Sequence, residues 1–84
     1  MPYIKKFKRL QLGPSLYQIR DCMENGGDLN YCFTKLCHMY MEKYGESYQN
    51  YSDCLAALEG AKLEFYRKKV APYEDIKEKD NGPV

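Results

Sequence analysis

Apolar side chains recur every three or four residues between positions 29 and 44, which is the spacing of one face of an α-helix. Asp28 stands directly before this run, where it can act as an N-cap, and Gly45 stands directly after it, where glycine ends many helices. The pattern therefore predicts a helix over 29–44 with one buried face. That face consists of Leu29, Cys32, Phe33, Leu36, Met39, Tyr40 and Tyr44.

The same spacing predicts one helix on each side of this segment. The first is expected to begin at Pro14, since proline suits the first turn of a helix, and to end at the Asn-Gly-Gly run 25–27. The third has Ser47 as its N-cap, runs from about 48 to 70, and is expected to end before Pro72. Its main apolar face is Tyr51, Cys54, Leu55, Leu58, Ala61, Phe65 and Tyr66.

A chain of 84 residues makes one domain, and the three segments predict an all-α fold with a long third helix. Residues 1–12 are expected to form a basic N-terminal arm, and residues 13–75 the helical domain. Residues 76–84 carry charge, Asn-Gly and proline but little to bury, so they are expected to form a flexible charged tail.

Charge and cysteine content narrow the class of protein. A net charge of +1 and a pI of about 7.6 argue against a general nucleic-acid binder. The basic first twelve residues lack the apolar core of a signal peptide, and no run approaches the length of a membrane span. We therefore expect a cytoplasmic protein that does not bind a membrane. Its four cysteines (22, 32, 37 and 54) are expected to be free thiols, although in a secreted protein they would indicate two disulfides.

No recognised catalytic motif occurs in the sequence, and we predict no enzyme activity, no cofactor and no bound metal. Cys37 and His38 are neighbours, but adjacent residues on one helix point to different sides, which disfavours both a metal site and a nucleophile–base pair. The Gly26-Gly27-Asp28 stretch can receive an anion at a helix start, yet the Asp28 carboxylate is better explained as a cap.

The third helix has a second face with small residues. Ala56, Gly60 and Leu63 lie together on it, and a glycine inside a helix costs about 1 kcal/mol relative to alanine. The favoured interpretation is a homo-oligomer interface, because a small domain often needs a partner subunit. The alternative is packing inside the domain itself.

Two groups of residues can hold an anionic nucleotide, because phosphate needs a cation and a base needs a flat ring. Lys62 and Tyr66 lie one turn apart on the third helix, although an ordinary pairing of Lys62 with Glu59 is the simpler explanation for that lysine. The second group is the cations of the arm beside Phe7, which an unstructured, solvated arm also explains. They are Lys5, Lys6, Lys8 and Arg9.

A possible protein-contact patch lies on the outer side of the second helix. Tyr31, Thr34, His38 and Met41 are expected there, and tyrosine and methionine favour interfaces. An ordinary surface, or packing against the N-terminal arm, explains these residues equally well.

Most of the chain resembles a family of short, uncharacterised proteins found mainly in bacteriophage and prophage genomes. The resemblance rests on GDLNYCFTKLCHMYM (27–41), SYQNYSDCLAALEGAKLEFYRKKVAPYED (47–75), the DNG at 80–82 and the opening MPYI. It implies that APYED (71–75) terminates the third helix. The closing Pro83-Val84 departs from the Asp-Val-Tyr that often ends the family pattern.

Together, the resemblance and the residues favour a non-enzymatic phage accessory protein that binds and blocks or sequesters a host protein or signalling nucleotide. A role against host defence is an analogy with other small phage proteins. The alternatives are a nucleic-acid-associated regulator, suggested by the basic arm, and an enzyme, for which no constellation of residues was found.

Overall fold

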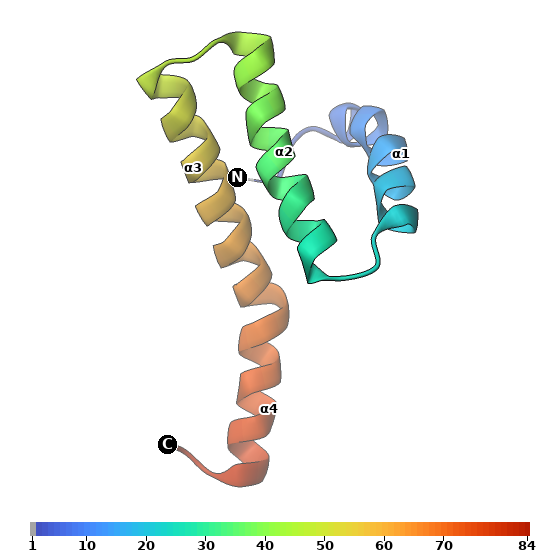
Figure 1. Cartoon of the computed structure of the whole chain (residues 1–84). Coiled ribbons are helices and arrows are strands. Elements are labelled where there is room, and N and C mark those ends of the chain that lie inside the picture. The colour runs from blue at the N-terminus through green and yellow to red at the C-terminus, as the bar shows by residue number, and fades with distance from the viewer. Residues whose placement is uncertain (1) are drawn as a thin grey trace.

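The computed structural model describes residues 2–84 and contains helices but no strand in that range (Figure 1). The chain forms α1 (Lys6–Cys22), α2 (Gly26–Tyr44), α3 (Tyr48–Phe65), a π-helical turn η1 (Tyr66–Val70) and α4 (Ala71–Asn81). α3, η1 and α4 join into one helix of 34 residues. The predicted all-α fold of three helices with a long third one is therefore confirmed.

Helix α1 begins at Lys6, eight residues earlier than predicted, so most of the basic arm is helical. Pro14 lies inside the helix rather than at its start. A proline in a helix removes one backbone hydrogen bond, but the residues before it are lysine, arginine, leucine and glutamine, which favour helix. Their propensity, together with Arg9 Nε donating to the Ile4 carbonyl at 2.8 Å, explains why the helix extends to Lys6.

The start of α2 is capped by Asn25, and not by Asp28 as the sequence suggested. The Asn25 side chain accepts the Asp28 N–H at 2.9 Å, while the Asp28 carboxylate reaches back to the Glu24 N–H at 2.9 Å. This reciprocal pair resembles a capping box, and it holds residues 23–25 in an extended conformation between α1 and α2.

A tight turn between α2 and α3 uses the residues that the sequence indicated. Gly45 adopts a φ of 95°, which disfavours any other residue, and its N–H donates to the Met41 carbonyl. Ser47 caps α3 by accepting the Asn50 N–H at 3.1 Å. The Asn50 amide also donates to the carbonyls of Tyr44 (3.3 Å) and Gly45 (2.9 Å), which ties the turn to the first turn of α3.

The prediction that Pro72 ends the third helix is wrong, and residues 76–81 of the segment expected to form a flexible tail are helical. The helix widens instead, with the Ala71 N–H donating to the Tyr66 carbonyl five residues earlier, and then continues as α4 to Asn81. A π-turn offers a proline room that an α-turn lacks, because the ring would collide with the carbonyl four residues before it. The Tyr66 hydroxyl donates to Glu74 across this turn.

Helices α2 and α3 lie side by side and antiparallel, whereas α1 is splayed away from α2 and α4 extends beyond the pair (Figure 1). Met41, 8% exposed, is the single buried hydrophobic residue in the part of the chain that the structure describes. The fold measures 50 × 31 × 29 Å. It is therefore an open arrangement in which one helical hairpin forms most of the packed structure.

The N-terminal segment returns to α3. The Tyr3 hydroxyl donates to the Glu64 carboxylate, and Arg67 Nη2 donates to Tyr3 Oη at 3.2 Å and to the Glu64 oxygens at 3.0 and 3.1 Å. These contacts hold the start of α1 near the third helix.

Candidate binding surface

An apolar groove of about 970 Å³ runs along one side of the α2–α3 hairpin. We call the residues that line it the groove face. They are Leu29, Phe33, Leu36, Cys37 and Tyr40 from α2, and Asp53, Cys54, Ala57, Leu58, Ala61, Lys62 and Phe65 from α3.

Large side chains of the groove face are half exposed. Phe33 is 46% exposed, Leu36 49% and Phe65 63%. The sequence predicted these stripes of α2 and α3 correctly as apolar faces, but it predicted that they would be buried. Within residues 2–84 the two helices form the walls of the groove and no other element lines it.

The groove face carries opposite charges at two places along α3. Asp53 lies toward the α2–α3 turn, where it accepts hydrogen bonds from the Tyr40 hydroxyl (3.3 Å) and from Gln49 Nε2 (2.8 Å). Burial and the nearby Asp53 raise the pKa of the Tyr40 hydroxyl. Lys62 lies nine residues further on, about 14 Å along the helix axis. The lining of the groove is thus mainly apolar, with the acidic Asp53 toward one end and the basic Lys62 toward the other.

Two thiols meet at the base of the groove. Cys54 Sγ donates to the Cys37 carbonyl at 3.8 Å, and partial burial together with the Cys37 neighbour raises the pKa of the Cys54 thiol. All four cysteines are free thiols. A raised thiol pKa lowers the fraction of reactive thiolate at Cys54, and both cysteines contribute to the wall of the groove.

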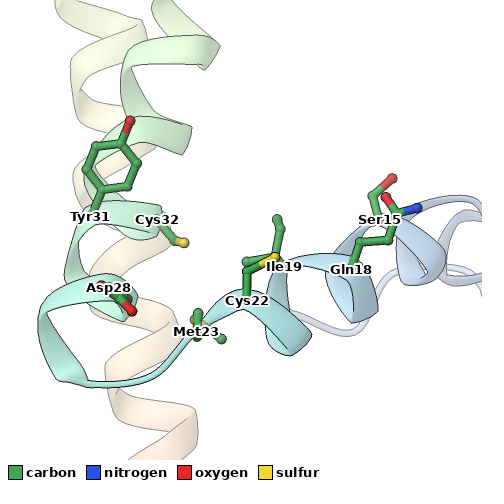
Figure 2. A pocket seen from close by; sticks show the side chains of 8 residues that line it. All are labelled: Ser15, Gln18, Ile19, Cys22, Met23, Asp28, Tyr31 and Cys32. Carbon is green, nitrogen blue, oxygen red and sulfur yellow. The ribbon is translucent and has the colours of Figure 1, made fainter.

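A second, shallower hollow of about 570 Å³ lies between the end of α1 and the start of α2 (Figure 2). Ile19, Cys22 and Met23 reach it from α1 and the following residues, and Cys32 points toward them from α2. The hollow is mostly apolar and contains a single carboxylate, that of Asp28, which already bonds the backbone of Glu24. Two free thiols, Cys22 and Cys32, are part of its lining.

Lys62 and Tyr66, the two residues of the third helix that were predicted to hold a nucleotide, do not line the same pocket. Lys62 pairs with Glu59 at 3.8 Å, as the simpler interpretation held, and both side chains are exposed. Tyr66 directs its hydroxyl to Glu74 instead. Lys62 and Phe65 both line the groove, whereas Tyr66 does not. The nucleotide site stays a prediction.

The four cations of the arm fall at the start of α1 and just before it. Lys5, Lys6, Lys8 and Arg9 are all exposed, and Lys8 Nζ donates to Gln11 at 3.2 Å. They lie outside the residues that line either hollow, so their proposed role with phosphate also stays a prediction.

The predicted oligomer face lies outside the groove face. Ala56 and Leu63 are exposed, and Gly60 is partly buried. A Cβ added at Gly60 would meet nothing within 4 Å, so no helix of the same chain approaches it closely. Whether a second copy does so remains a prediction.

Three of the four residues in the predicted protein-contact patch are exposed on α2, namely Tyr31, Thr34 and His38. The Thr34 hydroxyl donates to the Asn30 carbonyl at 3.0 Å. Met41 is different, because it is buried and therefore not available for contact. The prediction that Met41 belongs to this exposed patch is therefore wrong. The apolar stripe of α2 is wide, so a residue at its edge can be buried while residues at its centre, such as Phe33 and Leu36, are half exposed.

Neither metal-binding clusters nor membrane spans occur in residues 2–84. No three side chains of the histidine, cysteine, aspartate and glutamate types lie close enough to hold a metal ion. None of the helices combines the length and apolar character needed to cross a membrane.

Comparison with known proteins identifies a family but no characterised relative. The sequence profile of a family described as a domain of unknown function (DUF6899) matches residues 1–84. Neither a curated protein nor a solved structure matches the chain.

Proposed function

The chain belongs to the DUF6899 family, and we propose that it acts without catalysis, by binding another polypeptide through the groove face. The observation that carries this proposal is the half-exposed apolar surface shared by α2 and α3, centred on Phe33 and Leu36. Contiguous apolar surface of this kind on a small protein marks an interaction site, because exposing it to water is unfavourable.

A helical partner suits this groove better than a small ligand. Two antiparallel helices form a channel into which the apolar side of another helix packs, with contacts spaced every three or four residues. A nucleotide needs cations and hydrogen-bond donors directed at its phosphates. Lys62 is the one cation on the groove face, and its side chain is 74% exposed and paired with Glu59.

The setting that we propose for this binding is an infected bacterium, where the protein blocks or sequesters a host component. The resemblance to phage and prophage proteins supports this setting. A non-enzymatic role is consistent with a surface whose chemistry is apolar contact rather than acid–base or nucleophilic chemistry.

Site-specific photo-crosslinking in cells tests the proposal. A photo-reactive phenylalanine analogue replaces Leu36 in the groove, and in a matched control it replaces Tyr48, which is 86% exposed at the start of α3. We expect a covalent adduct with a polypeptide from position 36 and none from position 48. The mass of the adduct identifies the bound polypeptide. Absence of a polypeptide adduct at position 36, or equal yields at both positions, contradicts the proposal.

A further inference from the structure

Cys37 and Cys54 meet across the α2–α3 hairpin, each from within its own helix. They lie 17 residues apart in the sequence, and both are partly buried. Cys54 Sγ donates to the Cys37 carbonyl at 3.8 Å. The Cys37 Cβ is only two bonds from that carbonyl carbon, so rotation of the two side chains between staggered positions can bring the sulfur atoms together.

The two thiols also interact with each other directly. Partial burial, and then a hydrogen bond with the Cys37 side chain, raise the pKa of the Cys54 thiol. A hydrogen bond between two thiols requires their sulfur atoms to lie in near contact, which is the arrangement from which a disulfide forms. The other two cysteines differ, because Cys22 and Cys32 reach their hollow from α1 and α2, which splay apart (Figure 1).

We propose that Cys37 and Cys54 are a reversible redox site, which a low-molecular-weight disulfide such as oxidised glutathione converts to an intramolecular disulfide across the hairpin. One protein thiolate attacks the oxidant, forms a mixed disulfide and releases one glutathione thiolate. The second protein thiolate attacks the protein sulfur of the mixed disulfide and releases the other glutathione. The protein loses two electrons and two protons, and the oxidant is reduced to two thiols. Because the pKa of the Cys54 thiol is raised, the exchange should be slow at neutral pH and should accelerate as pH rises.

The disulfide would act on the groove and on the stability of the hairpin. Both cysteines line the groove, one from each helix, so the bond fixes the distance between its two walls. It also closes a loop that contains the α2–α3 turn, which restricts the unfolded chain and stabilises the folded hairpin. The bond forms whether or not the groove binds a polypeptide, and only its effect on that binding rests on the proposed function.

Peptide mapping of the folded full-length chain tests the site. The chain is equilibrated with oxidised and reduced glutathione, its remaining thiols are alkylated, and it is digested with trypsin. Cleavage after lysine and arginine leaves Cys22 and Cys32 on one peptide (21–35), Cys37 on a second (36–43) and Cys54 on a third (44–62). We expect peptides 36–43 and 44–62 joined to each other as the main disulfide product. Any other main product, or no disulfide at all, overturns the proposal.

Comparison with the unfolded chain separates the geometry of the fold from nearness in sequence. The Cys22→Ser/Cys32→Ser chain is equilibrated with glutathione in buffer and in concentrated urea. The fold should raise the equilibrium constant for the Cys37–Cys54 bond at least about tenfold, and the bond should lower the unfolding constant by the same factor. Adding Cys54→Ser, whose hydroxyl can still donate to the Cys37 carbonyl, should leave a single glutathione on Cys37. A smaller ratio overturns the proposal but leaves the proposed function standing, because crosslinking at position 36 reports on the groove independently.

Discussion

Met41 is the residue whose loss should destabilise the α2–α3 hairpin most. Met41→Ala removes three side-chain heavy atoms from a position that is 8% exposed. Burial of those groups contributes about 2 kcal/mol, and the cavity left behind adds to the loss, since Met→Ala changes in cores cost about 2–5 kcal/mol. The open groove beside the site lets neighbours and water fill part of the space. We therefore expect a loss of about 2–3 kcal/mol.

Urea unfolding followed by circular dichroism, at one fixed protein concentration, measures this loss. One concentration is used throughout because any self-association would make the measured stability depend on it. Met39→Ala is the matched control, because Met39 lies on the same helix but is 47% exposed. It should cost less than about 1 kcal/mol. Equal losses for the two variants would refute the claim that the burial of Met41 makes it more important to stability than Met39.

Three further predictions concern the turn, the N-terminal contacts and the thiols. Asn50→Asp removes an amide that donates two bonds across the α2–α3 turn, so urea unfolding should show a loss of about 1–3 kcal/mol, and a loss below about 0.5 kcal/mol would contradict it. The hydrogen bond from Tyr3 lowers the pKa of Glu64 below the ordinary carboxyl value of ~4.3. The ionised Glu64 therefore stabilises the fold above that ordinary value, and this stabilisation is lost as pH falls through the lowered pKa. The gap in melting temperature between wild type and Glu64→Gln should therefore be present at pH 7 and vanish near pH ~3; a gap that persists in acid counts against this. In alkylation followed by mass spectrometry, exposed Cys22 should react before Cys54, whose thiol pKa is raised, and the reverse order would exclude this account.

The helical fold followed from local signals in the sequence. Spacing of apolar residues located α2 and α3, and Ser47 and Gly45 marked their ends correctly because caps act within a few residues of the chain. The prolines misled the prediction of helix boundaries. Pro14 and Pro72 each remove one hydrogen bond, but the surrounding residues favour helix, and at Pro72 a single widened turn absorbs the ring.

The groove face was only half predictable from the sequence. Periodicity identified Phe33 and Leu36 as members of an apolar face, but it carries no information on whether the covering element lies in the same chain. Met41 shows the converse, since it was expected on an exposed patch and is 8% exposed. The sequence did contain one indication that these faces would stay exposed. A domain of three helices has few elements that could cover apolar faces on both its second and its third helix.

Occupation of the groove face tests the central claim most directly. A photo-reactive phenylalanine analogue at position 36 reports a polypeptide in the groove, and the same analogue at the exposed Tyr48 is the matched control. The account predicts a covalent polypeptide adduct from position 36 and none from position 48. No adduct from position 36, or equal yields from both positions, would contradict it.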